Sequence, residues 1–204
     1  MLFRSSGNVR QLVDGVDLIL DATDNFEARF LLNDVSLACS IPWVYGGCLG
    51  AEGQTMTIVP GQTACLRCLM PEGPPAPTDL PTCDTAGIIA PIIHLIAAVQ
   101  VAEGLKLLSG NRSAISRKLQ CFSLWDQRHR QIDVGRLRET SDCPACHRGR
   151  YEWLAGERAS QTAVLCGRNG IQIRPDAALS CDLAEVARRW QGLGRVAQRS
   201  EEHT

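Results

Sequence analysis

Hydrophobic and polar positions change their spacing along the chain, and these changes predict the first elements. Residues 16–20 form a short apolar run that stops at Asp21, which is typical of an interior parallel strand whose carboxyl end opens into a crevice. Over residues 25–40 the apolar positions recur near helical spacing, and Asn25 can act as the N-cap. The pattern therefore predicts a strand, a loop and a helix in this order.

The following segments have the patterns of strands. Residues 41–47 predict a strand that ends at two glycines, and residues 53–59 alternate between polar and apolar as an antiparallel strand does. Further along, residues 118–126 and 130–137 predict two more strands, joined as a hairpin. Strands and helices are thus mixed along one chain, as in an α/β fold.

An apolar run over residues 86–102 has to be compared with a membrane span. It is shorter than the roughly 20 residues that a spanning helix requires, and Pro91, His94 and Gln100 interrupt it. We therefore predict a buried helix and no membrane contact.

The segment ahead of this helix, residues 70–82, is rich in proline. Proline excludes both a helix interior and a central strand, so the segment is predicted to be an exposed, mobile crossover. Beyond it, Asp84 or Thr85 can cap the long helix, which Ser109 and Gly110 would end.

Composition and charge narrow the class of protein. The 204 residues are 45% hydrophobic, which is enough for one substantial core. A formal net charge of −1, without a basic stripe, argues against nucleic acid as a partner. Residues 1–15 lack the apolar region of a signal peptide, so we predict a cytoplasmic protein. Ten cysteines are too many for disulfides in a reducing compartment, which favours metal binding or thiol chemistry.

Two cysteine pairs have the spacing of metal ligands. Cys65 and Cys68 form the first pair, and Cys143 and Cys146 form the second. Four thiolates complete a tetrahedral zinc site, which would here staple two distant segments. The alternatives are a redox dithiol and ordinary core cysteines. Thioredoxin-type motifs begin a helix, whereas neither pair precedes a helical pattern, so structural zinc is the favoured interpretation.

The acidic loop at residues 21–25 and the isolated Cys83 each allow two interpretations. A carboxylate at the carboxyl end of a parallel strand can hold Mg²⁺ on a nucleotide, but Asp and Asn after a strand are more often turn formers and helix caps. Cys83 lies ahead of the long helix, where thiols are more reactive, and an inert, half-buried cysteine is equally compatible with the pattern.

The order of the motifs resembles a known family. The motifs are DATDNFEARFLLND, YGG, CLRC, the segment from Cys83 to Gly110, SLWD and CPAC. Over residues 10–150 this series is similar to the later part of the ubiquitin-activating-like adenylyltransferases, the ThiF/MoeB/HesA family. The resemblance implies an α/β fold with a Rossmann-like, mostly parallel but partial sheet, additional antiparallel strands and a zinc staple.

The resemblance also implies an activity. Members of this family use Mg²⁺ and ATP to adenylate the C-terminal Gly-Gly carboxylate of a ubiquitin-like sulfur-carrier protein of the ThiS/MoaD type, for thiamine or molybdopterin biosynthesis. They are homodimers, so a homodimer is expected here. Residues 70–82 correspond to the crossover under which the tail of the carrier threads.

The resemblance assigns roles to residues of this sequence. It implies that Asp24 is catalytic and binds Mg-ATP, and that Asn25 and Arg29 bind the cofactor, with Asn33 supporting the same helix. Cys83 matches the thiol that joins the carrier through an acyl-disulfide in the ThiF branch. The implied zinc ligands are Cys65, Cys68, Cys143 and Cys146.

The sequence departs from the family on its N-terminal side. The Gly-rich phosphate loop of the family has no counterpart ahead of Val16, and the residues around Gly7 do not form a G-x-G-x-x-G turn. We therefore expect a fragment, a truncated gene product, or a chain whose missing part a partner restores. A catalytically inactive, zinc-stapled module that binds a carrier or a full-length relative is the main alternative to an enzyme, and a zinc-independent thiol oxidoreductase is a weaker one.

The resemblance ends near residue 150, which suggests a division of the chain. Residues 1–149 are predicted to form the C-terminal part of the adenylation domain, and residues 150–204 an extension of unknown role. Within the extension, residues 170–175 have the pattern of a strand, and a helix is predicted from Asp182.

Overall fold

The computed structural model describes residues 6–74, 86–158, 162–165, 170–173 and 182–192. The elements in these ranges are α1 (Val9–Leu12), β1 (Ile19–Leu20), α2 (Phe26–Cys39), β2 (Trp43–Leu49), β3 (Glu52–Ile58), α3 (Leu66–Leu69), α5 (Ala90–Leu108), the 3₁₀ helix η2 (Arg112–Ala114), β4 (Lys118–Ser123), β5 (Arg128–Asp133), α6 (Leu137–Thr140), β6 (Thr162–Leu165), β7 (Gly170–Ile173) and α7 (Leu183–Trp190).

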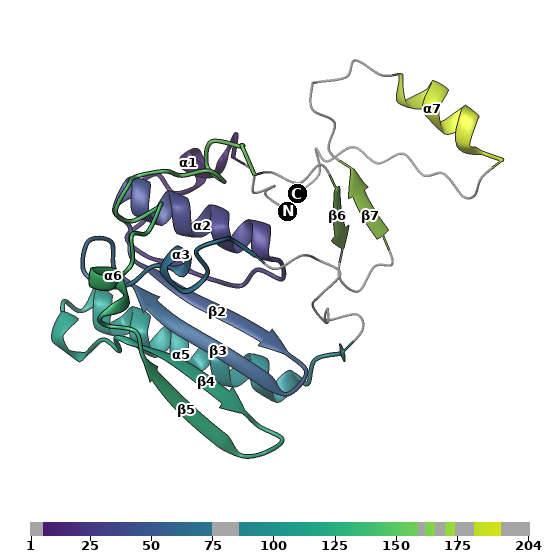
Figure 1. The fold of residues 1–204 in the computed structure, drawn as a ribbon. Helices are drawn as coiled ribbons and strands as arrows, with labels where there is room; N and C mark the ends of the chain where they lie inside the picture. The colour runs from purple at the N-terminus through teal and green to yellow at the C-terminus, as the bar shows by residue number, and fades with distance from the viewer. Residues whose placement is uncertain (1–5, 75–85, 159–161, 166–169, 174–181, 193–204) are drawn as a thin grey trace.

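The main sheet has the strand order β1-β2-β3-β4-β5 (Figure 1). β1 pairs parallel with β2, and the remaining neighbours are antiparallel, as the alternation in residues 53–59 and the predicted hairpin require. The prediction of an interior position for β1 is wrong for the described residues, where β1 lies at one edge of the sheet. Ile19 is buried in the core, whereas Leu20 is 44% exposed. The apolar run therefore does not mean burial at every position of β1.

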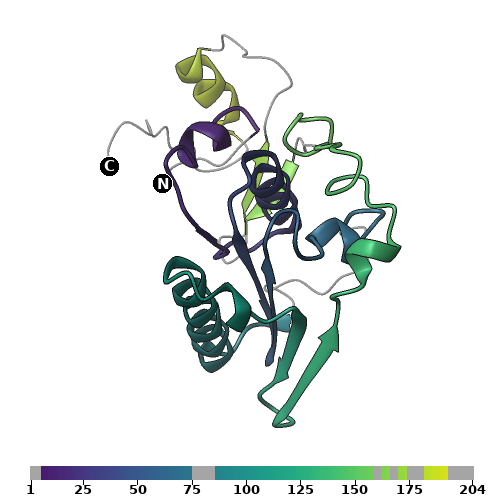
Figure 2. The ribbon, with the colours of Figure 1, turned by 90° about the vertical axis from the view of Figure 1, so that its left-hand side faces the viewer.

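Helices cover both faces of the sheet. Figure 2 shows α2 and α5 on opposite faces, with the sheet seen nearly edge-on between them. The core on the α2 face contains Phe30, Val35, Trp43 and Ile58, all of them fully buried. Helix α2 begins as predicted, since the side chain of its N-cap Asn25 accepts a hydrogen bond from the Ala28 amide at 2.8 Å.

Helix α5 is buried on one face only. Its residues toward the sheet are Ile92, Ile96, Gln100, Glu103, Gly104 and Leu107. The prediction of a buried helix is wrong for the opposite face, where Leu105 is 63% exposed and Ile93, Val101 and Leu108 are also exposed. A continuous apolar run has no polar stripe from which the exposed face could be located. By length and composition α5 is the one described helix that could cross a membrane, and 33% of its most apolar stretch is buried within the protein.

The ends of α5 were predicted unequally well. It ends at Leu108, where the sequence placed its stop, and Ser109 is the C-cap. It begins at Ala90 with Pro91 in the first turn, and the N-cap Ile89 makes no side-chain hydrogen bond. The expected caps, Asp84 and Thr85, lie outside the described residues.

The segment that follows the second cysteine pair packs into the same core. The ring of Trp153 stacks on Phe30 with 4.4 Å between centroids. The fully buried Asp34 of α2 accepts hydrogen bonds from the backbone amides of Trp153 at 2.9 Å and Leu154 at 3.3 Å. Burial raises the pKa of Asp34 to about 6, against the opposing effect of these amides. These contacts continue the core beyond residue 149, the predicted end of the first domain.

The last described elements are a hairpin and a helix. β7 corresponds to the strand predicted at residues 170–175, and it pairs antiparallel with β6. β6 was not predicted. The N-cap of α7 is Asp182, as predicted, and its side chain accepts a hydrogen bond from the Ala184 amide at 2.9 Å.

Candidate functional site

The acidic loop leaves the sheet at the carboxyl end of β1, where Asp21 anchors it. This side chain is almost fully buried and accepts hydrogen bonds from the Thr23 amide at 2.9 Å and the Thr23 hydroxyl at 2.7 Å. Its other oxygen accepts a longer hydrogen bond, 3.4 Å, from the Gly46 amide of β2. Burial raises the pKa of Asp21, while the hydrogen bonds from Thr23 and the charge of Arg29 oppose that rise. The loop is therefore held from inside the protein by a residue for which no separate role was predicted.

Asp24 and Asn25 lie on the surface of this loop. Asn25 is the N-cap of α2, and its amide nitrogen also donates to the Asp24 carboxylate at 3.0 Å. The capping interpretation is thus confirmed for Asn25, which leaves Asp24 as an exposed carboxylate beside the first turn of α2. A carboxylate in this place is available to a cation from solvent, and the protein does not have to move to expose it.

Arg29 lies beneath the loop. Its guanidinium donates to the Thr23 carbonyl at 2.8 Å and lies 3.7 Å from the Asp21 carboxylate, and the side chain is only 11% exposed. The rings of Phe26 and Tyr45 flank it, at 5.5 and 5.8 Å from their centroids. Arg29 therefore supports the loop from inside, and its role in binding the cofactor stays a prediction.

Asn33 connects the same helix with the first cysteine pair. The side chain is fully buried, and its oxygen accepts a hydrogen bond from the Leu66 amide of α3 at 2.8 Å. α3 follows Cys65 directly, so this bond fixes the first cysteine pair against α2. Asn33 thus supports the first cysteine pair, whereas the resemblance grouped it with the nucleotide residues.

The two cysteine pairs meet in one cluster, as their spacing predicted. The sulfur atoms of Cys65, Cys68, Cys143 and Cys146 all lie within 4.8 Å of one another. The Sγ atoms are separated by 3.8 Å between Cys65 and Cys68, and by 3.6 Å between Cys65 and Cys143. The Cys68 and Cys146 sulfurs are 3.5 Å apart.

These distances fit a tetrathiolate metal site. A tetrahedron of sulfur atoms around zinc, with bonds of about 2.3 Å, has edges of about 3.8 Å. The convergence of four sulfurs favours a structural metal centre over two separate redox dithiols.

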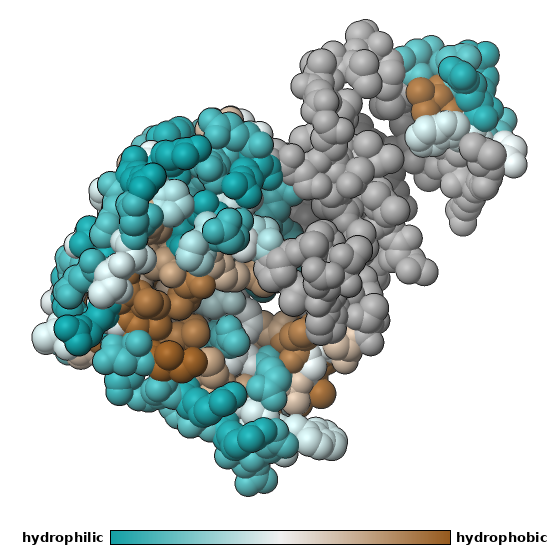
Figure 3. Space-filling model, in the orientation of Figure 1, coloured by the Kyte–Doolittle hydropathy of each residue, from teal (hydrophilic) through white to brown (hydrophobic). Residues whose placement is uncertain are grey.

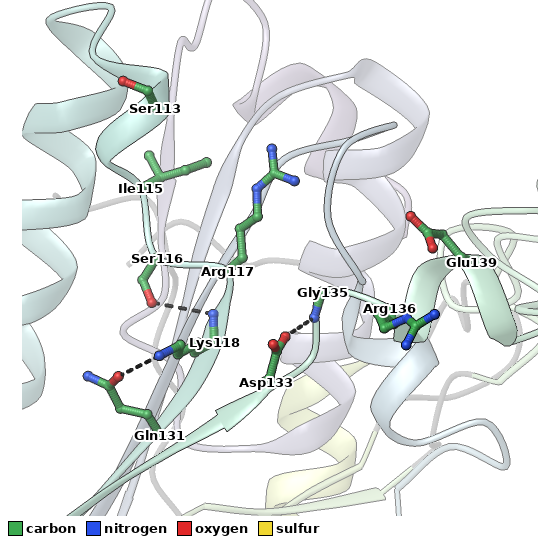
Figure 4. Close-up of a pocket in the computed structure, with 10 residues that line it drawn as sticks. All are labelled: Ser113, Ile115, Ser116, Arg117, Lys118, Gln131, Asp133, Gly135, Arg136 and Glu139. Atoms are coloured by element: carbon green, nitrogen blue, oxygen red, sulfur yellow. Dashed lines mark hydrogen bonds between the residues drawn. The ribbon is translucent and has the colours of Figure 1, made fainter.

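A cavity lies beside the paired strand ends that carry Lys118 and Asp133. It has a volume of about 570 Å³ and lies between η2, the paired ends of β4 and β5, and α6. Figure 4 shows Lys118 bonded to Gln131, and Asp133 bonded to the Gly135 amide. None of the predicted site residues lines this cavity. Cys83, the remaining predicted site residue, lies outside the described residues.

Known proteins resemble this chain over most of its length. The sulfur carrier protein ThiS adenylyltransferase of Bacillus subtilis is 38% identical over 187 residues, which are 92% of this chain and 54% of that protein. The SAMP-activating enzyme E1 of Haloferax volcanii is 37% identical over 142 residues, which are 70% of this chain and 51% of that protein. The chain thus spans about half the length of these relatives.

Solved structures share the fold. The structure of E. coli MccB with ATP has a TM-score of 0.51 at 15% identity, over 72% of this chain and 43% of that chain. The complex of MccB with AMPCPP and MccA has a TM-score of 0.55 at 15% identity, over 72% and 44% of the two chains. At this identity the likeness confirms the α/β fold alone.

The family is decided by sequence. The ThiF family matches residues 3–145, which include the acidic loop and three of the four clustered cysteines. The relative from Bacillus subtilis is named an adenylyltransferase and that from Haloferax volcanii an activating enzyme, in agreement with this match. This chain belongs to the ThiF family.

Proposed function

We propose that this chain is part of an ATP-dependent adenylyltransferase that activates the C-terminal Gly-Gly carboxylate of a ubiquitin-like sulfur-carrier protein. The observation that carries the proposal is the exposed carboxylate of Asp24, on a loop that leaves the carboxyl end of a parallel strand. The name of the Bacillus subtilis relative supports a carrier of the ThiS type, and therefore thiamine biosynthesis.

The residues of the acidic loop suit the chemistry of this reaction. Adenylation joins a carboxylate oxygen of the carrier to the α-phosphorus of ATP and breaks the bond to pyrophosphate. When bound, Mg²⁺ would neutralise phosphate charge, and Asp24 is the residue of the loop that would hold it. Asp21 and Arg29 would keep Asp24 in place from beneath, through the contacts of both with Thr23. To the adenylation step itself the protein would thus contribute alignment and charge, and no covalent bond.

An uncovered part of the sheet offers room for the carrier. The α2 face is open beyond β3, where Leu119 is half-buried and Ile132 is 50% exposed. Figure 3 shows apolar side chains gathered in this hollow, between α3 and the hairpin of β4 and β5. An extended Gly-Gly tail could lie along such a face on its way to the acidic loop. The hollow supports the proposal of a carrier partner.

The test is carrier-dependent exchange of labelled pyrophosphate into ATP by the zinc-replete chain, with Mg²⁺ and a ThiS-type carrier. We expect exchange with the intact carrier and none with a carrier that lacks its terminal glycine. A MoaD-type carrier in parallel reports which pathway the chain serves. Sedimentation of the same sample tests the homodimer, which stays a prediction. A folded, zinc-loaded chain that binds neither Mg-ATP nor the carrier would contradict the proposal.

The alternative function is a zinc-stapled binding module without catalysis. Such a module needs only the cysteine cluster and a face on which a carrier or a full-length relative can dock. The division into residues 1–149 and an extension stays a prediction under either function. Calorimetry separates the two functions. Carrier binding that is equally strong with and without Mg-ATP, together with no pyrophosphate exchange, would establish the module.

We also propose that Cys83 captures the carrier covalently after a persulfide donor has transferred a sulfur atom to its thiol. The outer sulfur of the Cys83 persulfide then attacks the acyl-adenylate, AMP leaves, and an acyl-disulfide joins the two proteins. A Cys83→Ala variant should adenylate the carrier at the unchanged rate and form no carrier conjugate that a thiol reductant can release. Cys39→Ala is the control, because Cys39 is exposed at the end of α2 and should leave both steps unchanged. Conjugates that persist in the Cys83→Ala variant would remove Cys83 from this role.

A further inference from the structure

Gln100 is a polar residue on the buried face of an apolar helix, and both of its N–H bonds are used. The side chain is almost fully buried. Its amide nitrogen donates to the carbonyl oxygen of Asp21 at 2.9 Å and to that of Val44 at 3.0 Å. The orientation of the amide is set by these partners, since both are acceptors and only the nitrogen can donate to them.

These two carbonyls lie where the parallel pairing of β1 with β2 ends. Asp21 follows the last residue of β1, and its own amide donates to the Val44 carbonyl of β2 at 3.1 Å. Beyond this bond β1 has no further ladder to β2. Gln100 therefore takes the place of the next ladder bond, and it does so at the residue from which the acidic loop departs.

Gly46 leaves the space that Gln100 occupies. A Cβ atom at position 46 would lie 2.5 Å from the Gln100 amide nitrogen, which is closer than non-bonded atoms approach. The Gly46 amide in turn donates to the Asp21 carboxylate at 3.4 Å. This close approach explains why the YGG motif has a glycine at position 46. The glycine admits a side chain from α5 to the strand ends.

We propose that Gln100 is a positioning residue for the acidic loop, and that it sets the place of Asp24 by fixing the backbone of Asp21. The inference rests on the proposed function and deepens it, because it assigns the precision of the candidate site to a residue of α5. Three contacts carry it, namely Gln100 to the Asp21 carbonyl, Asp21 to Thr23, and Asn25 to Asp24. The Val44 carbonyl already accepts from the Asp21 amide, so the buried Asp21 carbonyl is the group that needs the Gln100 donor, and packing alone would not supply one.

The test compares Gln100→Met with Glu103→Met. Methionine keeps the length and volume of either side chain and removes its polar group. Glu103 lies one turn further along α5 and is also buried, where it accepts hydrogen bonds from the Thr57 hydroxyl at 2.9 Å and the Ser116 amide at 2.8 Å. It makes no recorded contact with the acidic loop, so Glu103→Met matches the loss of a buried polar group without touching the strand ends.

Amide hydrogen exchange of the full, zinc-loaded chain is the first readout. In Gln100→Met the Thr23 and Gly46 amides should exchange about tenfold faster relative to the amides of β3, since the loop opens without the sheet. In Glu103→Met this ratio should stay within about twofold of the unchanged chain. Equal ratios in the two variants, or no change in Gln100→Met, would overturn the proposal.

Carrier adenylation is the second readout. Gln100→Met should lower kcat about tenfold with little change in the KM for the carrier, because a misplaced Asp24 affects the reaction and not the docking of the carrier. Full activity despite faster loop exchange would also overturn the proposal. If the unchanged chain adenylates no carrier, the proposed function fails, and hydrogen exchange still decides the role of Gln100.

Discussion

A Cys143→Ser chain should lose its zinc, and with it the packing of the segment that follows. Cys143 is one of four sulfurs within 4.8 Å of one another, and serine is a poor zinc ligand beside three thiolates. Structural zinc in small domains contributes on the order of 10 kcal/mol to folding. In a chain of this size the loss should unfold the cysteine cluster and lower the midpoint of unfolding sharply.

The loss of packing should extend to residues 151–158, because this segment contacts both α2 and the segment of the first cysteine pair. Trp153 lies against Phe30, and the two backbone amides that bond to Asp34 come from the same segment. Arg67, which lies between Cys65 and Cys68, pairs with the Glu152 carboxylate at 3.2 Å. Without the metal, Cys65 and Cys143 no longer keep the segments that carry these groups together.

Two measurements check this expectation. Metal analysis should give one zinc per unchanged chain and much less in Cys143→Ser, and tryptophan fluorescence should shift to the red as Trp153 meets water. Cys39→Ser is the matched control, because Cys39 is an exposed cysteine outside the cluster. Full zinc content in Cys143→Ser would show that other residues hold the metal.

The second large effect concerns the reaction. Asp24→Asn should reduce carrier adenylation by roughly 100-fold or more, since a metal ion at transferring phosphate contributes several kcal/mol and each 1.36 kcal/mol is tenfold in rate. The fold should be unaffected. The asparagine oxygen can still accept the hydrogen bond from Asn25, and the cap of α2 belongs to Asn25 itself.

A control variant tests whether the loss of any exposed carboxylate near β1 would lower the rate. Asp17→Asn is the control, because Asp17 is an exposed carboxylate near the opposite end of β1 and should leave the rate unchanged. The Mg²⁺ concentration for half-maximal rate should rise in Asp24→Asn and stay constant in Asp17→Asn. A rate in Asp24→Asn within threefold of the unchanged chain would remove Asp24 from the site.

Local patterns predicted the parts of this molecule whose cause is local. The cap at Asn25 depends on one side chain and the amide three residues on, and the hairpin of β4 and β5 depends on alternation and a short turn. The cysteine cluster could be predicted although it is not local, because each pair already has the spacing that two ligands of one ion require.

The remaining parts depend on burial, which the sequence does not display. Asp21 and Asp24 are the same residue type within one loop, and only the fold makes the first a buried anchor and the second an exposed carboxylate. Gln100 looked like an interruption of an apolar run, yet it bonds to two strands far from it in sequence. Leu105 looked buried because its neighbours are apolar, and it is exposed.

The cysteine cluster also bears on the order in which the chain folds. Cys65 and Cys143 are 78 positions apart, and closing such a loop in an unfolded chain costs roughly 4 kcal/mol of chain entropy. The pairing of β3, β4 and β5 already brings both cysteine segments to one end of the sheet. We therefore expect zinc to bind after the sheet has formed. In a zinc finger, by contrast, the ligands lie close in sequence and the metal can nucleate the fold.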